Sequence, residues 1–538
     1  MNTPREIDSE HAVIGIDPVV FDRRWKILAV LCTSLMVVIV GNTALNVALP
    51  TLARDLNAST SAQQWMVDAY GLVFAGLLLT AGTIGDRYGR KGALQVGLSI
   101  FLFGSLLAAF MDSANAIIVG RAVMGFGAAF VMPATLSILT NVFPPHERGK
   151  AIAIWAGVSG GGAAIGPVAS GFLLEHFSWG SVFLVNVPII AIALAAGYVL
   201  LPKSKDPDPD RLDPTGALLS IAGLSALVYA IIEAPHNGWA SGTSLTLFGV
   251  AIVLIGLFLW WEMRTEFPML NLRFFLDPRF GVASGVITLT FFAMFGFFFL
   301  MTQYFQLVLG YGTLEAGAKQ LPFAAILMTC APRAPGLAAK FGANRVVAFG
   351  LSGVTIAMFL FAVVGKDTSY AAILPITMIM AFGMAMIIPS MTGSIMSAVP
   401  MGKAGVGSAM NDTTRELGGA LGVAVLGSLV ASRYGSKLVP ALTSLTGPLR
   451  AKAEESLAGA LQSARQVGGA DGLRVSTIAR DAYVSGMHLA GIVAGCVALI
   501  AAIVVYRFLP ASNSHTGPAA SSARPNTDAS IPQTDPVG

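Results

Sequence analysis

Charged side chains are rare inside the apolar stretches of this chain, and the few that occur there are the residues that could do chemistry. Asp412 and Glu416 stand four residues apart, with Arg415 beside Glu416. Residues i and i+4 share one face of a helix, so Arg415 lies close enough to neutralise one of the two carboxylates. An acid in apolar surroundings can alternate between binding a proton and facing a cation. The alternative is an internal salt bridge that only holds the structure.

Two further charges lie in apolar stretches. The segment 61–64, Ser-Ala-Gln-Gln, resembles a capping box and Trp65 an interfacial anchor, which predicts Asp68 in the second turn of a helix near a membrane edge. A solvated acid at a helix start is the alternative for Asp68. Arg121 lies roughly 10 Å into its stretch, too deep for a loop charge. Its alternative is snorkelling to the surface.

The elements that must position these residues are membrane-spanning helices. The 538 residues are 55% hydrophobic and 12% charged, with a mean hydropathy of +0.72, which is typical of a polytopic membrane protein. The sequence lacks the period-two alternation that is typical of a membrane β-barrel, so we expect an all-α fold. Fourteen apolar stretches are long enough to span a bilayer. They are 27–49, 65–85, 92–111, 115–139, 150–174, 180–201, 214–233, 243–262, 280–309, 316–334, 346–364, 371–398, 405–431 and 485–508.

The length of the thirteenth stretch places its charges. If this helix began after Glu416, the apolar run from Leu417 to Ala431 would span roughly 22 Å, short of a hydrocarbon core of about 30 Å. Asp412, Arg415 and Glu416 are therefore expected in or near the membrane.

The distribution of basic residues predicts the topology. An even number of spans puts both termini on one side, and Lys and Arg concentrate on that side. The short loops of the other side hold only Arg54, Lys319 and Lys366. We therefore expect a multi-pass protein of the cell (inner or plasma) membrane with both termini cytoplasmic and an uncleaved first span. The net charge of +4 is a topology signal, so no nucleic-acid partner is expected.

A glycine-rich segment with charges of both signs, 82–91, lies between the second and third stretches. Its expected gating residues are Gly82, Gly85, Asp86, Arg87, Gly89 and Arg90. The segment 335–342 is a weaker copy, with Ala339 where the first has Asp86. Such a repeat is typical of transporters built from two similar bundles around a midplane cavity. We expect the first copy to latch the two bundles on the cytoplasmic side.

Small residues and a proline mark the fifth stretch, at Gly162, Gly166, Pro167 and Gly171. Glycines let helices pack closely, and Pro167 removes a backbone hydrogen bond, which suits a hinge. Static close packing is the alternative.

These motifs together resemble the fourteen-span drug:proton antiporters of the major facilitator superfamily, the group with QacA-like and EmrB-like exporters. The segments 121–127 and 179–188 add to the resemblance, which covers residues 25–510. Met124 and Ser170 depart from the family pattern, where Gln and Gly are common. The resemblance implies a major facilitator fold of two six-helix bundles plus two extra central transmembrane helices. It also implies a proton-coupled multidrug efflux antiporter, with Asp68 as a proton and substrate site and Arg121 facing the cavity.

The same comparison divides the chain. We expect an N-terminal tail (1–24), an N-terminal six-helix bundle (25–202), a linker with the two added helices (203–279), a C-terminal bundle (280–510) and a disordered cytoplasmic tail (511–538). Within the C-terminal bundle, residues 432–484 form an outer loop that carries Leu449, Leu457 and Leu461 at helical spacing. This pattern predicts a small amphipathic helix, either as part of a solvated hairpin or as a partner-binding element.

Missing acids bear on the substrate. Gly41 and Leu327 stand where relatives place acids in the first and tenth spans. With fewer cavity acids a dication would be poorly compensated, so we expect lipophilic monocations or neutral amphiphiles. The phenylalanines between 291 and 299 point to all sides of the ninth stretch, so the sequence does not indicate which of them lines a cavity.

Several classes of function lack their motifs. The chain has no GxxxxGK[ST], GxSxG or HExxH, and Cys32, Cys330 and Cys496 have no CxxC partner, so we expect no enzyme, cofactor, disulfide or metal site. The expected partners are protons, small amphiphilic substrates and the lipid bilayer, with no obligate protein partner. The proton gradient would supply the energy. An exporter dedicated to one endogenous metabolite or lipid, and a non-transporting scaffold, are the alternatives.

Overall fold

The computed structural model describes residues 17–205, 212–268, 270, 272–399, 404–439 and 447–510, and every regular element among them is a helix. Residues 1–16 of the expected N-terminal tail and the whole of the expected disordered tail, 511–538, lie outside the described residues. The first part of the chain forms α2 (Pro18–Asp55), α3 (Thr60–Tyr88), α4 (Arg90–Phe110), α5 (Ala114–Val142), α6 (Pro145–His176), α7 (Ser181–Leu184) and α8 (Asn186–Leu200). Two long helices, α9 (Pro214–Asn237) and α10 (Gly242–Arg264), and the short η1 (Leu272–Leu276) follow.

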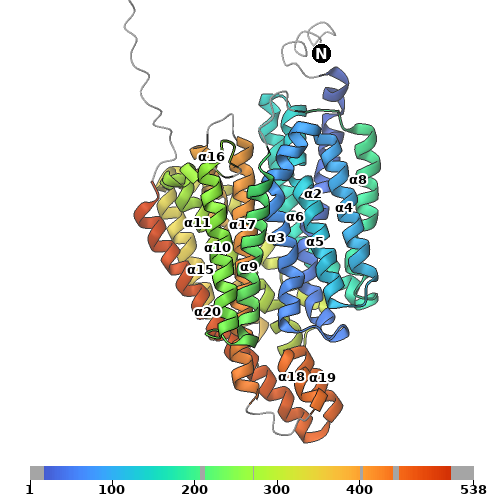
Figure 1. The fold of residues 1–538 in the computed structure, drawn as a ribbon, viewed down its shortest axis with the longest axis vertical. Coiled ribbons are helices and arrows are strands. Elements are labelled where there is room, and N and C mark those ends of the chain that lie inside the picture. Colours follow the sequence, from blue (N-terminus) through green and yellow to red (C-terminus); the bar gives the residue numbers. More distant parts are fainter. Residues whose placement is uncertain are drawn as a thin grey trace, which may run out of the picture.

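The second part of the chain contains both long and broken helices. They are α11 (Pro278–Gln303), the π-helix η2 (Tyr304–Val308), α12 (Thr313–Ala318), α13 (Leu321–Cys330), η3 (Ala331–Arg333), α14 (Ala334–Phe341), α15 (Ala343–Phe361), α16 (Tyr370–Ala398), α17 (Ala404–Leu438), α18 (Gly447–Glu455), α19 (Leu457–Val467) and α20 (Gly469–Phe508). The helices α2 to α8 pack mainly on one another, as do α11 to α20. We call these two groups the N-terminal and C-terminal halves (Figure 1).

Thirteen of the helices or helix runs in the described part of the chain are long and apolar enough to cross a membrane. They coincide with thirteen of the fourteen predicted stretches. The remaining stretch, 150–174, lies in α6, a 32-residue helix. The all-helical membrane fold expected from composition is confirmed.

The long helices run between two ends of the molecule. The N-terminal face carries the start of α2 and the turn between α3 and α4, and the opposite end carries α18 and α19 (Figure 1). We call the latter the hairpin face. The helix α3 begins at the hairpin face and ends at the N-terminal face. Residues early in α3 therefore lie nearer the hairpin face.

The helix α9 lies against the line where the two halves meet, which we call the seam. It packs on α3 of the N-terminal half and on α17 of the C-terminal half. Leu72, Val228, Ile232, Ala420 and Ala424 form part of one buried cluster that joins the three helices. The helix pair α9 and α10 therefore covers one side of the seam.

The repeated glycine segments have the same backbone form. Gly89 ends α3 and begins α4 with φ +122°, and Gly342 ends α14 and begins α15 with φ +92°. Only glycine adopts such angles readily. The second segment is thus a structural counterpart of the first, as the sequence repeat predicts.

The structure corrects three boundaries. Helix α2 begins at Pro18, with Asp17 Oδ1 accepting from Val19 N at 2.8 Å, so residues 18–24 are helix and not tail. The cap of α3 is Ser59, which accepts from Ala62 N, so the expected capping box at 61–64 is wrong. The expected outer loop, 432–484, is shorter, since α17 continues to Leu438 and α20 begins at Gly469. The remainder contains the two helices α18 and α19.

The two short helices dock on the bundle rather than standing free. Tyr434 Oη donates to the carbonyl oxygens of Ala453 and Ser456 at 3.0 and 3.2 Å. Thr60 Oγ1 of α3 donates to Glu455 O at 3.1 Å. The hairpin of α18 and α19 therefore contacts both halves.

Candidate functional site

Asp68 is a buried acid in α3. Its exposed fraction is 1%, and neither of its carboxylate oxygens has a hydrogen-bond partner among the described residues. The alternative of a solvated acid at a helix start is therefore wrong. A buried polar group without a partner is costly, so such a group in a membrane protein indicates a functional site.

A small cavity joins Asp68 to the other half of the molecule. Its volume is about 10 Å³, which is room for about one water molecule. The lining residues are Asn42, Val67, Asp68 and Gly71 of the N-terminal half and Phe295, Glu416, Gly419 and Ala420 of the C-terminal half. The cavity therefore lies in the seam, between α2 and α3 on one side and α11 and α17 on the other.

Glu416 reaches this cavity because the facing helix has no side chain at the contact. A Cβ atom on Gly71 would lie 3.3 Å from Glu416 Oε2. The glycine lets α17 bring its acid close to α3, one turn from Asp68. The structure thus places two acids that are far apart in sequence at one site.

Arg121 is buried, and each of its guanidinium nitrogens donates a hydrogen bond. Its exposed fraction is 0%, so snorkelling is wrong. Nε and Nη1 donate to the carbonyl oxygens of Met66 and Gly41, each at 3.0 Å, and Nη2 donates to Asn42 Oδ1 at 3.3 Å. The guanidinium also lies over the Tyr70 ring, 4.3 Å from its centroid.

These contacts give Arg121 an organising part in the site. It joins α5 to α2 and α3 through groups that adjoin or line the cavity, and its charge lies near enough to Glu416 for a Coulombic interaction. No ion pair between Arg121 and a carboxylate occurs in the described part of the chain. Arg121 therefore acts on Glu416 through its charge, without direct contact.

Asp412 and Arg415 lie on the same helix as Glu416 but in a different network. Arg415 Nη1 is 3.7 Å from Asp412 Oδ1, and Arg415 Nη2 donates to Thr392 Oγ1 at 3.4 Å. Asn411 Nδ2 donates to Asp412 Oδ1 at 3.4 Å. Neither Asp412 nor Arg415 lines the cavity with Asp68. Of the three charges expected together at 412–416, only Glu416 joins Asp68.

Polar side chains close the seam toward the hairpin face. Gln64 Nε2 of α3 donates to Val423 O at 3.1 Å and Ala424 O at 2.9 Å, both in α17. Gln306 Nε2 of η2 donates to Val47 O of α2 at 2.9 Å. Each bond joins one half to the other. The halves are therefore in contact on the hairpin-face side of the Asp68 cavity.

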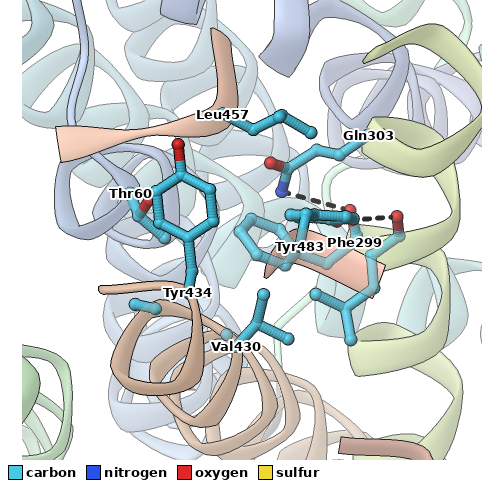
Figure 2. Close-up of a pocket in the computed structure, with 10 residues that line it drawn as sticks. Thr60, Phe299, Gln303, Val430, Tyr434, Leu457 and Tyr483 are labelled. Carbon is cyan, nitrogen blue, oxygen red and sulfur yellow. Dashed lines mark hydrogen bonds between the residues drawn. The ribbon is translucent and has the colours of Figure 1, made fainter. Parts of the chain in front are cut away.

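A second cavity lies in this closed region, beneath α19. Its volume is also about 10 Å³. Figure 2 shows Thr60 of α3 and Leu457 of α19 at its border with Tyr434 and Tyr483. Tyr483 Oη donates to Leu300 O at 3.0 Å. The hairpin thus covers the seam where α3, α11, α17 and α20 approach one another.

The small residues of α6 divide into two groups. Gly162 and Gly166 face α2 within the N-terminal half, where added Cβ atoms would meet Ile39 and Thr43. Gly171 crosses the seam: a Cβ there would lie 2.6 Å from Thr313 O of α12. Thr313 Oγ1 in turn donates to Gly171 O at 3.0 Å.

Pro167 belongs to the second group. The helix α6 continues through this proline, and a Cβ on Gly317 of α12 would collide with Pro167 O. The segment expected to act as a hinge therefore also supplies a close contact between the halves.

Among the described residues, the hydrogen bonds and the ion pair of Asp86 in the segment 82–91 stay within the N-terminal half. Asp86 Oδ1 pairs with Arg90 Nε at 2.6 Å and accepts from Ser137 Oγ at 3.1 Å. Arg90 N donates to Ser204 O at 3.0 Å, in the segment that follows α8. Arg87 lies over Tyr88. Its function as a latch stays a prediction.

Sequence reasoning named two of the eight cavity residues, Asp68 and Glu416, and missed six: Asn42, Val67, Gly71, Phe295, Gly419 and Ala420. Asn42 and Gly71 look like ordinary polar and packing residues, and Phe295 is one of several phenylalanines around its helix. The i+3 spacing from Asp68 to Gly71 is the one signal that could have found the glycine, since such residues share a helix face.

Two helical halves that meet at a buried site with ionisable residues define a class of protein, the membrane transporters built from two bundles. A family model described as Major Facilitator Superfamily matches residues 31–423. The chain belongs to the Major Facilitator Superfamily.

Named relatives narrow the class. The chain is 36% identical over 485 residues to the multidrug efflux pump LfrA of Mycolicibacterium smegmatis, covering 90% of this chain and 96% of that protein. It is 32% identical to the tetracenomycin C resistance and export protein of Streptomyces glaucescens, covering 90% and 91%. It is 32% identical to the methyl viologen resistance protein SmvA of Salmonella typhimurium, covering 89% and 97%. The protein is thus a multi-pass membrane transporter of the drug efflux type and not an enzyme.

Solved structures agree on the fold. A bacterial homologue of the human lysosomal transporter Spinster, in an inward-facing and unoccupied conformation, superimposes with a TM-score of 0.62 at 16% identity. The match covers 91% of this chain and 98% of that one.

Proposed function

We propose that this protein is a proton-coupled multidrug efflux antiporter of the fourteen-span, QacA/EmrB-like type that exports lipophilic monocations and neutral amphiphiles. One observation carries the proposal. Asp68 from the N-terminal half and Glu416 from the C-terminal half border the same buried cavity, and Asp68 has no hydrogen-bond partner among the described residues. Because the two acids come from opposite halves, their protonation changes the free energy of bringing the halves together.

The coupling follows from charge compensation. A protonated Asp68 or Glu416 is neutral and suits the closed, nearly dry cavity, whereas an ionised one needs a cation or water beside it. A proton and a cationic substrate therefore compete for the same carboxylates. Each proton that moves down a potential of 100 mV supplies about 2.3 kcal/mol, so no cofactor is required. Protons, substrate and lipid are the proposed partners, without an obligate protein partner.

The closed hairpin face indicates from which side of the membrane substrate would enter. We assign the N-terminal face to the cytoplasm, since Lys and Arg concentrate there, and the hairpin face to the outside. The Gln64 and Gly171 contacts then close the outer side. The protein in this state is ready to take up substrate from the inner side, and the cavity must widen, because 10 Å³ admits only water.

The proposed moving parts are the two six-helix bundles, 25–202 and 280–510, with the linker 203–279 between them. The packing of α9 on both α3 and α17 supports a linker that follows both bundles. The pairing of Asp86 with Arg90 and Ser137 keeps Asp86 on the N-terminal bundle in this state. We propose that its latch to the other bundle forms when the cytoplasmic side closes.

The preference for monocations rests on the small number of cavity acids. At Gly41 a Cβ would lie 2.8 Å from Phe101 Cζ, so this position has no room for an acidic side chain. A relative is named for resistance to methyl viologen, which is a dication, so the charge of the substrate is the sharpest point to test. Equal transport of a monocation and methyl viologen would refute the preference.

The test uses purified protein in proteoliposomes with an imposed pH gradient and a fluorescent lipophilic monocation. We expect Asp68→Asn and Glu416→Gln to abolish gradient-driven uptake and Asp412→Asn to reduce it less, because Asp412 is paired with Arg415 outside the cavity. Glu233→Gln in α9 is the matched control. Uptake at the unaltered rate in both the Asp68 and the Glu416 variant would overturn the site and would favour a scaffold.

A dedicated exporter of one endogenous compound is the second candidate. The relative named as a tetracenomycin C resistance and export protein favours it, because that name specifies a single polyketide. Transport of several unrelated amphiphiles that compete with one another would support the multidrug function. Strong selection of one compound by the Asp68 site would support the dedicated exporter.

A further inference from the structure

Two buried carboxyl groups meet at the N-terminal-face end of α9 and α10, away from the Asp68 cavity. Asp213 caps α9 and Glu262 lies in the last turn of α10, with exposed fractions of 8% and 4%. A Cβ atom on Gly216 would collide with Asp213 Oδ2 and would lie 2.6 Å from Glu262 Oε1. Both oxygens therefore border one point, and two negative charges so near each other would repel strongly.

Asp213 has the surroundings of a negative charge. Its Oδ1 accepts from Gly216 N at 2.8 Å, in the first turn of α9. Trp261 Nε1 donates to Oδ1 at 2.9 Å and to Oδ2 at 3.1 Å. These donors and the N-terminal end of the helix dipole stabilise an ionised carboxylate.

Glu262 has surroundings that suit a neutral acid. Its Oε2 accepts from Leu270 N at 2.9 Å, in the segment that leads to η1. Its Oε1 is buried and has no hydrogen-bond partner in the part of the chain that the structure describes. An ionised Oε1 would leave a buried negative oxygen without a donor and next to Asp213, whereas a proton on Oε1 removes both costs.

We propose that Glu262 and Asp213 form a proton-binding site, in which Glu262 Oε1 carries the proton and Asp213 carries the charge. The proton comes from the solution on the N-terminal face and returns to it. Glu262 holds Leu270 through its other oxygen, Oε2, so the loss or gain of the proton changes the strength of that contact. None of these residues lines the Asp68 cavity, so the site is separate from the proposed transport site.

Between Glu262 and the end of η1, the other charged side chains among the described residues are Arg264, Glu266 and Arg273. Arg264 stacks on Trp260 with 4.9 Å between the guanidinium carbon and the ring centroid, and Glu266 is exposed. Asp213 is the titratable group at the facing end of α9, since Glu233 and His236 lie near its other end. Arg273 follows in η1. The residues 206–211 lie outside the described part.

The sign of the pH dependence follows. At low pH the proton is bound and Leu270 N donates to a neutral acid. As the pH rises the proton leaves, Glu262 Oε2 becomes a charged acceptor, and its hydrogen bond from Leu270 N strengthens. The docking of Leu270 on Glu262 therefore tightens as the pH rises.

Infrared spectroscopy of the full-length protein in lipid tests proton binding. A carboxylic acid has a C=O stretching band that a carboxylate lacks. We expect Glu262→Gln to remove part of this band from the spectrum in mildly acidic buffer, and the control Glu266→Gln to leave it unchanged. Asp213→Asn removes the neighbouring charge, so the Glu262 band should disappear at a lower pH. A Glu262→Gln spectrum identical to that of the parent protein throughout the titration would overturn the proposal.

Hydrogen exchange tests docking independently of the infrared band. With rising pH the exchange of the Leu270 amide should accelerate less than intrinsic exchange does, because the ionised Glu262 is the stronger acceptor for this amide. In Glu262→Gln this extra protection should be absent, because the amide oxygen of Gln still accepts from Leu270 N but does not titrate. The same extra protection in both proteins would refute the coupling of the proton to Leu270.

Discussion

Glu416 Oε2 lies 3.3 Å from the position that a Cβ atom on Gly71 would occupy, although the two residues belong to different halves of the transporter. This separation is tighter than ordinary van der Waals contact, so residue 71 sets how near the acid comes to α3. The relationship joins the chemistry of the site to the movement of the halves, because Glu416 leaves α3 whenever the seam opens there.

The first prediction concerns this contact. We expect Gly71→Ala to crowd Glu416 and to destabilise the closed seam by about 1 to 3 kcal/mol, as overpacking does. Transport of the fluorescent monocation should fall with the protein still folded. Gly285→Ala in α11 is the control, since nothing lies within 4 Å of its Cβ position. Equal transport by both variants would show that the approach of Glu416 to Gly71 is unimportant.

The second prediction concerns the polar seal at Gln64. Removing its hydrogen bonds to α17 by Gln64→Ala should destabilise the closed hairpin face by about 1 to 3 kcal/mol. The control is Gln63→Ala, because Gln63 Nε2 donates within its own half, to Ala58 O and Ser59 O.

The measurement for the seal is the distance between spin labels on exposed positions of the two halves near the hairpin face, Phe110 and Val363, in a cysteine-free background. Gln64→Ala should add a population with a longer distance. A distribution that the Gln64 change leaves untouched, or that Gln63→Ala changes equally, would argue against a seal at Gln64.

The third prediction separates the two groups of small residues in α6. Gly171→Ala should exclude the closed hairpin face, because its Cβ would lie 2.6 Å from Thr313 O and 2.7 Å from Leu314 Cα, both backbone atoms of the other half. Gly162→Ala meets Ile39 Cγ2 at 3.1 Å and Ile39 Cβ at 3.2 Å, side-chain atoms of the same half, so it adds no contact across the seam. The same pair of spin labels should report a longer distance for Gly171→Ala alone.

The fourth prediction concerns Arg121. Arg121→Lys keeps the charge but loses the planar fork that reaches Met66 O, Gly41 O and Asn42 Oδ1 together. Hydrogen bonds to a charged group contribute about 1.5 to 3 kcal/mol each, so the loss of one or two should lower the thermal stability measurably and reduce transport. Arg54→Lys near the hairpin face is the control. An unchanged melting temperature for Arg121→Lys would contradict the organising part given to Arg121.

Particular residues show how far sequence reasoning reaches into the site. The burial of Arg121 follows from its depth in an apolar stretch, because a helix advances a fixed 1.5 Å per residue. The burial of Asp68, expected near a membrane edge, and the partner of each charge do not follow. Asp412, Arg415 and Glu416 lie within five residues of sequence, yet the packing of α17 turns Glu416 toward α3 and leaves Asp412 with Arg415. Rotation of a helix about its axis is set by its neighbours.

The sequence by itself determined the class of the molecule, since long apolar stretches in water-free surroundings must form helices to satisfy their backbone groups. It also determined the repeat of Gly89 at Gly342, because a backbone with positive φ requires glycine. Only the tertiary structure decided that Asp68 and Glu416 share a cavity, that Gln64 and Gly171 close one side of it, and that Glu262 faces Asp213. Each of these is a contact between distant segments, and such contacts depend on how side chains of different helices fit together.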